Sequence, residues 1–228
     1  MNNVATIVAI TKPAIEGINT PEEFIAYCAR VSNPGNQMNN ETSEKLLKYC
    51  IKNKHFSIFE MVNVVMQIDT TRDIARQILR HRSFSFQEFS QRYADPTTDL
   101  GYSQSREARL QDPKNRQNSI SSNDLELQKW FNQAQQDVAG LAGEKYKEAI
   151  AKGIAKEQAR AVLPEGIMKS RLYMNGSARS WLTYFQVRCD KSTQKEHREI
   201  AISAAIEFKK HFPALSPIID EYMIGDNI

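Results

Sequence analysis

Cysteine is scarce in this sequence, and its placement excludes two common kinds of site. The 228 residues include only Cys28, Cys50 and Cys189, which are odd in number and far apart. They provide neither a disulfide framework nor the close pairs that bind zinc. The sequence therefore predicts a protein of a reducing compartment without a metal site.

Long apolar runs and a strong net charge are missing as well. No run approaches the roughly 20 residues that span a membrane, and the first residues lack the basic start and cleavage site of a secretory signal. The formal net charge of +3 is too mild for a protein that coats nucleic acid, although it suits a protein with anionic ligands. We expect a cytoplasmic protein that binds neither membranes nor nucleic acid.

The remaining composition is that of an ordinary folded domain. Hydrophobic residues make up 41% of the chain and charged residues 25%, and no repeat or low-complexity tract is present. A chain of this length can bury a substantial core. With the local patterns, this composition predicts one α+β domain spanning residues 1–228, with a small, mostly antiparallel sheet flanked by long helices.

Strand and helix patterns alternate along the chain. β-Branched or alternating apolar residues predict strands at 4–10, 61–68 and 167–174. The run Thr20-Pro21-Glu22-Glu23 predicts a capped helix start, and that helix is expected to continue through Val31. Amphipathic periodicity predicts further helices at about 41–54, from 72, and at 124–152, 156–163, 177–188 and 194–212. Residues 95–123 are mostly polar, so we expect a mobile loop or lid there.

Two of these helices have apolar stripes that we assign to the core. In the 124–152 helix the stripe consists of Leu127, Trp130, Phe131, Ala134, Val138, Leu141 and Tyr146, and Gly153 is expected to end the helix. In the last helix it consists of Ile200, Ile202, Ala205, Ile206 and Phe208. Apolar residues at helical spacing form a core far more often than a cofactor site.

The segment that begins at Arg72 differs from the rest of the chain. Arg72, Arg76 and Arg80 recur at intervals of four and share one helix face, while apolar residues occupy another. Like charges at this spacing disfavour a helix by a few tenths of a kcal/mol per pair. Protein carboxylates or a bound phosphate must therefore compensate them.

The end of this segment combines cations, hydroxyls and aromatic rings. The sequence RHRSFSFQEFSQR contains Arg80, Arg82 and Arg92, the titratable His81 and a single acid, Glu88. Such a set can hold a phosphate, contact a polar ring edge and support an aromatic cofactor. Surface salt bridges are the plainer interpretation, because arginine-rich helix ends usually form them.

This stretch resembles the RHRxxSxxExSxR signature of the flavin-dependent thymidylate synthases, and every fixed position is filled. Gln87 stands where many members have Asn. A second family motif, usually HxSPFE, resembles the run HFSIFE that begins at His55 and includes Ser57, with Ile58 in place of Pro. Considered alone, a histidine such as His55 is most often just a capped or surface residue.

Two further runs resemble motifs of the same family. ARAVLP matches A-R-x-x-L-P, in which the arginine, here Arg160, reaches a nucleotide bound to a neighbouring subunit. Without the family, Arg160 is a helix C-terminal cation favoured by the macrodipole. Residues 175–188 resemble the third motif, where Ser177 is also expected to cap a helix and Thr183 replaces the usual His or Asn.

The resemblance covers nearly the whole chain and implies the methylation of dUMP to dTMP. In that family 5,10-methylenetetrahydrofolate supplies the carbon, reduced FAD supplies the hydride, NADPH re-reduces the flavin, and a homotetramer forms the active sites between subunits. The implied dUMP-binding residues are Gln77, Arg80, Glu88, Ser90, Arg92, Arg160 and Arg188. The implied FAD-binding residues are His55, Ser57, Arg80, His81, Arg82, Glu88, Ser177, Arg179 and Thr183.

Arg188 is the implied catalytic residue. A fixed guanidinium beside the N3–C4=O edge of uracil would stabilise an ionised ring and make C5 nucleophilic. A salt bridge from Arg188 to Asp190 or Glu196 is the plainer alternative. Cys189 adjoins this arginine, but a small buried hydrophobe is its more ordinary role, and the family requires no enzyme nucleophile.

Three rival functions stay open at this stage. The interleaved arginines and phenylalanines of residues 80–93 would suit a stacking platform for single-stranded DNA. A flavoprotein of another class would share the flavin contacts without nucleotide chemistry. A non-catalytic relative that only binds nucleotide is the third, given the departures at Ile58 and Thr183.

Overall fold

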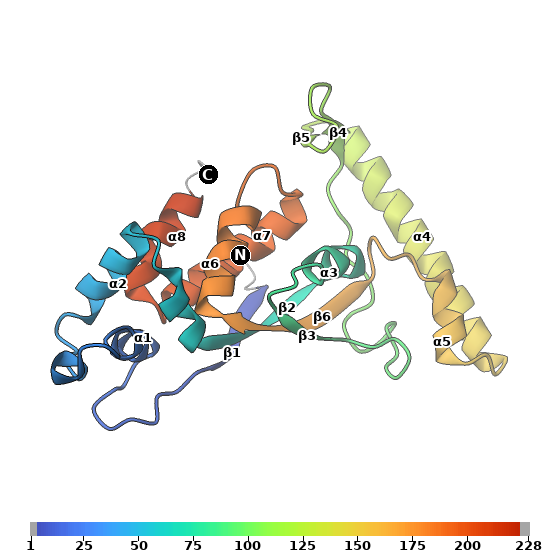
Figure 1. The fold of residues 1–228 in the computed structure, drawn as a ribbon. Helices are drawn as coiled ribbons and strands as arrows, with labels where there is room; N and C mark the ends of the chain where they lie inside the picture. The colour runs from blue at the N-terminus through green and yellow to red at the C-terminus, as the bar shows by residue number, and fades with distance from the viewer. Residues whose placement is uncertain (1–3, 224–228) are drawn as a thin grey trace. The chain divides into compact units, whose positions relative to one another are not determined.

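The computed structural model describes residues 4–223, and its elements are those of an α+β protein (Figure 1). The strands are β1 (Ala5–Ile10), β2 (Asn63–Thr71), β3 (Ser85–Glu88), β4 (Arg109–Gln111), β5 (Ser119–Ser121) and β6 (Lys169–Ser177). The helices are α1 (Pro21–Ala29), α2 (Ser43–Lys52), α3 (Arg72–Ile78), α4 (Leu125–Ala151), α5 (Lys156–Ala159), α6 (Ala178–Arg188), α7 (Lys195–Lys209) and α8 (Ser216–Met223). The predicted fold class is confirmed.

The main sheet has four strands in the order β1-β2-β6-β3. β1 and β2 run antiparallel, with Ala5 opposite Ile68 and Ile10 opposite Val64, and one bulge interrupts their register. β2 alternates as its sequence predicted, because Val64, Met66 and Ile68 are completely buried and their neighbours are not. The short strands β4 and β5 form a separate antiparallel pair.

The chain divides into two compact units. Unit 1 comprises residues 4–68, 81–86 and 173–223 of the described chain, and unit 2 comprises residues 69–80 and 87–172. Three strands, β2, β3 and β6, begin in one unit and end in the other. The single domain over residues 1–228 stays a prediction.

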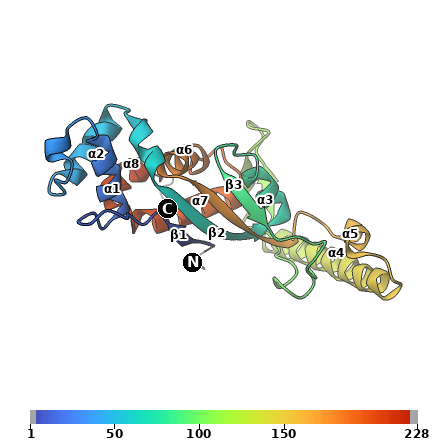
Figure 2. The ribbon, with the colours of Figure 1, turned by 60° about the horizontal axis from the view of Figure 1, so that its bottom comes forward.

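Aromatic side chains form the centre of unit 1. Trp181 and Phe185 of α6 are completely buried, and the rings of Phe208 and Phe212 stack with their centroids 4.1 Å apart. The indole N–H of Trp181 donates to the carbonyl of Val64 in β2, which ties α6 to the sheet. α1 and α2 pack against each other in the same unit (Figure 2).

α1 begins as predicted but ends sooner. The Thr20 hydroxyl accepts from the Glu23 backbone N–H, and the Glu23 carboxylate accepts from the Thr20 backbone N–H, so the predicted capping box is present. The prediction that Val31 belongs to the helix is wrong, and its side chain is exposed. The chain turns at Arg30, whose guanidinium donates to the carbonyl of Asn39.

α4 has both of its predicted ends. The Asp124 carboxylate accepts from two backbone N–H groups of the first turn, and Gly153 follows the helix with a φ of 82°, which a residue with a β-carbon rarely adopts. The buried side of α4 includes Tyr146, which packs with Ala159 and Met168 in the core of unit 2. No helix within residues 4–223 is long and apolar enough to cross a membrane.

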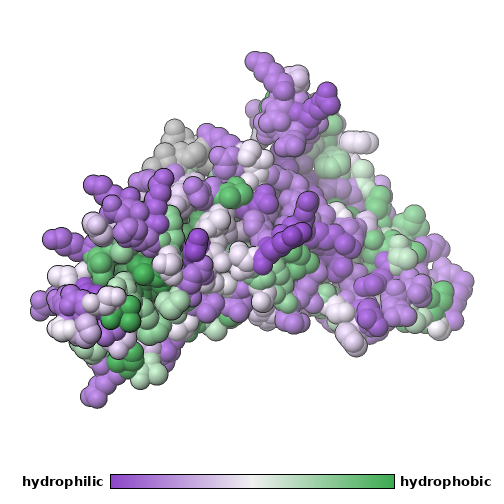
Figure 3. Space-filling model, in the orientation of Figure 1, coloured by the Kyte–Doolittle hydropathy of each residue, from purple (hydrophilic) through white to green (hydrophobic). Residues whose placement is uncertain are grey.

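The other side of α4 corrects the predicted core. Trp130, Val138 and Leu141 are exposed, so the prediction that they are core residues is wrong. They lie on a side of the helix that does not face the buried Tyr146. Hydrophobic surface is visible along α4 in Figure 3. The prediction that Ile206 of α7 is a core residue is wrong as well, because Ile206 lies opposite the buried residues of that helix and is exposed.

Residues 95–123, predicted as a mobile loop, contain the hairpin of β4 and β5. Arg109 pairs with Ser121 across the two strands. The Asp112 carboxylate accepts from the backbone N–H groups of Lys114 and Asn115, which closes the turn. Polar side chains therefore organise this segment, and a search for apolar periodicity does not detect such turns.

Three other elements differ from the expectations. β3 was not predicted, and α8 follows Pro213 where only a closing tail was expected. β6 starts at Lys169 and continues through Ser177, so the punctuation expected at residues 175–177 lies inside the strand. The strand needs no turn there because Ser177 is both its last residue and the N-cap of α6.

Candidate functional site

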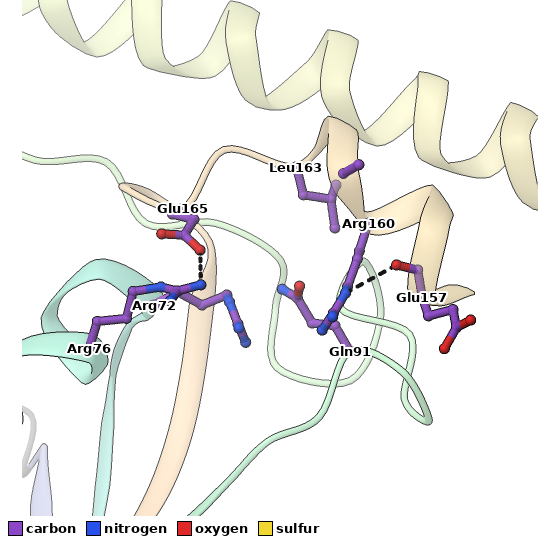
Figure 4. A pocket seen from close by; sticks show the side chains of 8 residues that line it. Arg72, Arg76, Gln91, Glu157, Arg160, Leu163 and Glu165 are labelled. Atoms are coloured by element: carbon purple, nitrogen blue, oxygen red, sulfur yellow. Dashed lines mark hydrogen bonds and ion pairs between the residues drawn. The ribbon is translucent and has the colours of Figure 1, made fainter. Parts of the chain in front are cut away.

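Unit 2 contains a cavity of about 400 Å³ with arginines in its wall (Figure 4). It is lined by Arg72, Arg76, Gln91, Glu157, Arg160, Ala161, Leu163 and Glu165. α3 provides Arg72 and Arg76, and the single 3₁₀ turn after α5 provides Arg160. Of the predicted nucleotide-binding residues, Arg160 is the one that lines this cavity.

Carboxylates compensate the two arginines of α3. Arg76 pairs with Glu165, and the Arg72 guanidinium lies 3.6 Å from the Glu88 carboxylate. The sequence predicted that protein carboxylates or a bound phosphate must balance these charges, and the structure supplies carboxylates. These arginines therefore contribute less positive charge to the cavity than their number indicates.

Two other residues of the cavity wall, Arg160 and Gln91, have no carboxylate partner among residues 4–223. The Arg160 Nε donates to the main-chain oxygen of Glu157 at 3.3 Å, which is a neutral acceptor. Gln91 is 3% exposed, and its amide nitrogen has no hydrogen-bond partner among residues 4–223. A buried donor without an acceptor costs about 1–3 kcal/mol. The two side chains lie next to each other in the wall of the cavity (Figure 4).

Sequence reasoning missed Gln91, which occupies a variable position of the signature. Three predicted residues lie in the same stretch of unit 2. The Glu88 carboxylate accepts from the Ser170 hydroxyl at 2.7 Å, Ser90 accepts from the backbone N–H of Arg92 at 3.3 Å, and the Arg92 guanidinium lies 3.4 Å from a carboxylate oxygen of Glu157. Only the burial of Gln91, which the sequence does not reveal, distinguishes it from its neighbours.

Arg80 and Arg82, like Arg160 and Arg188, have no carboxylate partner within residues 4–223. Arg80 follows the end of α3 in unit 2, and Arg82 belongs to unit 1. Both side chains are exposed, so each keeps its full charge for a ligand or for solvent. Gln77, on α3, is half-buried.

Arg188 and His81 meet in unit 1. Arg188, at the end of α6, donates from its Nε to the Nε2 of His81 at 2.9 Å, and both residues are half-buried. The alternative salt bridge to Asp190 or Glu196 is not found among the described residues. The carboxylates of Asp190 and Glu196 accept hydrogen bonds from other nearby side chains.

His81 of this pair and the neighbouring His197 are both held neutral. Burial, and then the Arg188 charge, lower the pKa of His81 to about 4. Burial also lowers the pKa of His197 to about 3, with smaller contributions from Arg188 and His81. His197 is completely buried, and its Nε2 lies 3.1 Å from the Tyr184 hydroxyl. The expectation that His81 changes its charge near neutral pH is therefore wrong.

Phe84 packs inside the same aromatic cluster. Its ring lies edge-on to Trp181 with centroids 4.9 Å apart, and a β-carbon added to Gly176 would lie 2.4 Å from it. The ring is thus half-buried against the other aromatic side chains of unit 1. This packing counts against Phe84 as a stacking surface for single-stranded DNA.

The start of α6 brings several predicted flavin-binding residues together. Ser177 caps the helix, and its hydroxyl donates to the Glu60 carboxylate. The Arg179 guanidinium lies 3.2 Å from the same carboxylate. Glu60 closes the motif that contains His55 and Ser57, and it is a further residue that the sequence interpretation did not assign to the site. One acid therefore links the second and third motifs within unit 1.

The remaining predicted residues have simpler surroundings. His55 and Ser57 are exposed, and the His55 ring meets Tyr49 edge-on with centroids 6.1 Å apart. The Thr183 hydroxyl donates to the carbonyl of Arg179, one turn earlier in α6. Cys189 is completely buried, as expected for a small hydrophobe.

Comparisons with known proteins agree with the motifs. Residues 15–214 match the family model described as thymidylate synthase complementing protein. A flavin-dependent thymidylate synthase of Synechocystis is 55% identical over 216 residues, which cover 93% of this chain and 97% of that protein. A probable flavin-dependent thymidylate synthase of Paramecium bursaria Chlorella virus 1 is 46% identical over 216 residues, covering 95% of this chain and 98% of that protein.

Solved structures agree in fold. The UMP/dUMP methylase PolB from Streptomyces cacaoi bound with 5-Br dUMP superposes with a TM-score of 0.74, covering 96% of this chain and 93% of that one. Its sequence identity is 23%, so the likeness concerns the fold. The structure of the same methylase with 5-Br UMP gives a TM-score of 0.75 at 20% identity.

Proposed function

Since this chain belongs to the thymidylate synthase complementing protein family, we propose that it methylates dUMP to dTMP with 5,10-methylenetetrahydrofolate as the carbon donor. Flavin dependence is common to its relatives at 55% and 46% identity. We propose that the flavin is FAD and that NADPH re-reduces it. When bound, the reduced flavin supplies the hydride.

The observation that carries the substrate proposal is the pair of donors at the cavity of unit 2. A nucleotide phosphate is best held by a guanidinium and by N–H groups without other acceptors, because charge-assisted hydrogen bonds are the strongest. Arg160 and Gln91 supply both. The proposed dUMP-binding residues are therefore Gln91 together with Gln77, Arg80, Glu88, Ser90, Arg92, Arg160 and Arg188.

Arg188 has the catalytic role in this proposal. Its guanidinium lies beside the N3–C4=O edge of uracil and stabilises the negative charge of the ionised ring, which makes C5 nucleophilic toward the carbon donor. The half-burial of Arg188 strengthens that effect, because water screens a partly buried charge less. Cys189, which is buried, takes no covalent step.

Seven of the nine residues proposed to bind FAD belong to unit 1. The FAD diphosphate requires cations, and Arg179 at the start of the eleven-residue helix α6 provides one, which it shares with Glu60. Arg82 adds an exposed charge without a carboxylate partner in the described chain. The proposed FAD-binding residues are His55, Ser57, Arg80, His81, Arg82, Glu88, Ser177, Arg179 and Thr183.

We propose that the enzyme is a homotetramer with active sites between subunits. The exposed stripe of α4 supports an interface, because Trp130, Val138 and Leu141 recur at helical spacing on one side. Large apolar side chains gathered on one exposed side mark interaction surfaces. The proposed occupant is a second copy of this chain, and sedimentation velocity of Trp130→Glu against the wild type tests it. Unchanged mass in the variant would contradict this interface.

The enzymatic proposal is tested by tritium release from 5-tritiated dUMP with methylenetetrahydrofolate and NADPH. We expect yellow, FAD-containing protein, and we expect Arg160→Met and Gln91→Leu to raise the KM for dUMP by about 10–100-fold, the value of one charge-assisted hydrogen bond. Arg116→Met is the control, because Arg116 is an exposed arginine of the β4–β5 turn. Unchanged KM values in the cavity variants would contradict the assigned pocket.

Growth of a thymidine-requiring host gives an independent test. The wild type should remove the requirement for thymidine, and Arg188→Ala should not, because the variant lacks the guanidinium that stabilises the uracil ring. Immunoblots must show equal amounts of both proteins. A well-expressed wild type that fails to support growth would contradict the proposed function.

A further inference from the structure

We propose that His81 is the positioning residue for Arg188 and holds its guanidinium in the orientation that acts on the uracil ring. This inference rests on the proposed function. It changes the role of His81 from a flavin contact alone to a residue that acts on the substrate through Arg188. The direct observation is the hydrogen bond of 2.9 Å from the Arg188 Nε to the His81 Nε2.

The choice of atom in Arg188 is the first argument. A guanidinium has five N–H donors, and His81 takes the single donor on Nε. The two terminal nitrogens, Nη1 and Nη2, have no partner among residues 4–223. They form a planar fork that can meet the oxygen and nitrogen of a pyrimidine edge at the same time. Binding through Nε therefore fixes the side chain and leaves its recognition surface open.

The chemistry of His81 is the second argument. Arginine only donates, so the His81 Nε2 must accept, and the ring must be neutral with its proton on Nδ1. Burial keeps it so, because it lowers the pKa of His81 to about 4. A lysine at position 81 would instead repel Arg188.

The packing around His81 is the third argument. Its ring meets Tyr184 edge-on with centroids 5.0 Å apart, and it lies 6.4 Å from the Phe84 ring and 6.3 Å from that of His197. The Tyr184 hydroxyl is in turn 3.1 Å from the buried Nε2 of His197. An acceptor held by rings on three sides can fix the end of a long, flexible side chain. The entropy of ordering Arg188 is thus lost on folding and not at the moment of substrate binding.

Two substitutions separate this role from a flavin contact. Glutamine places an amide oxygen near the position of the histidine Nε2, whereas asparagine places its amide near Nδ1 and has nothing at Nε2. In the FAD-loaded enzyme we expect His81→Gln to keep kcat/KM for dUMP within about threefold, and His81→Asn to lower it by about 10–100-fold. Flavin content and the thermal unfolding midpoint should be alike in both variants.

A double-mutant cycle with Arg188→Ala decides whether His81 acts through Arg188. If it does, His81→Asn costs little further activity once Arg188 is absent, because the group that it positions is gone. The Arg188 Nε–H should also give a protected signal in ¹H–¹⁵N spectra of the wild type and His81→Gln, and lose protection in His81→Asn.

The results that would contradict the positioning role differ from those that would contradict the proposed function. Losses that add in the cycle, or equal loss of flavin in the Gln and Asn variants, would overturn the positioning role while leaving the enzyme's activity established. Wild-type protein that contains FAD but releases no tritium from dUMP would instead contradict the proposed function.

Discussion

The contact between Gly176 and Phe84 gives a sharp prediction about stability. In Gly176→Ala the new methyl group would lie 2.4 and 2.5 Å from the Phe84 Cδ1 and Cε1 atoms, where real contacts exceed about 3.4 Å. The ring must therefore move by about 1 Å, and Trp181 at 4.9 Å and Tyr184 at 6.0 Å restrict this movement on its packed sides. Overpacking of this kind costs about 1–3 kcal/mol. For a chain of this size, that lowers Tm by roughly 2–10 °C.

Differential scanning calorimetry measures this change, and a second glycine provides the control. A β-carbon added to Gly140 on α4 meets no atom within 4 Å, so Gly140→Ala should raise stability by about 0.5–1 kcal/mol through helix propensity alone. Adding Phe84→Leu to Gly176→Ala should recover part of the loss, because the smaller side chain vacates the contact. Gly176→Ala with an unchanged Tm would refute the packing described for this cluster.

Three further predictions concern single residues. Burial raises the pKa of Glu22 from 4.5 to about 7, so the stability of the wild type should fall as pH rises between these values. Glu22→Gln should be about 1–2 kcal/mol more stable than the wild type at pH 8 and equally stable at pH 4. Urea unfolding at both pH values measures this, and equal stabilities at pH 8 would contradict it. Cys189→Ala should keep most of the activity in the tritium assay, because the thiol is buried and takes no covalent step; complete loss with normal flavin content would contradict this. Thr20→Ala should lower the free energy of unfolding by about 1 kcal/mol, because the capping box is lost. A chemical denaturation curve that coincides with that of the wild type would contradict this prediction.

Local rules of the chain predicted much of the fold. The capping box at Thr20, the alternation of β2, the cap at Ser177 and the end of α4 at Gly153 each depend on a few neighbouring residues, and the structure contains all four. The strand β3 escaped notice although Phe84, just before it, and Phe86, within it, alternate with polar residues. Four residues are too few for periodicity to outweigh the cluster of charges around them.

Non-local features were the ones that sequence reasoning could not predict. The apolar stripe of α4 has the spacing of a core, but spacing does not reveal whether the same chain covers it. Gln91 looks like any polar residue of a motif until burial leaves its amide unpaired. The neutral state of His81 likewise depends on packing and on Arg188, which is 107 positions away in sequence.

The two tryptophans of the chain lie in opposite environments, and this has a spectroscopic consequence. Trp181 is completely buried in unit 1, whereas Trp130 in unit 2 is 65% exposed. Each compact unit therefore has its own fluorophore: Trp181 should emit at short wavelength throughout, whereas Trp130 should emit at longer wavelength in the separated protomer than in the tetramer proposed to cover it. Replacing one tryptophan at a time by phenylalanine lets the melting of each half be followed separately, so that fluorescence alone distinguishes a single cooperative transition from two.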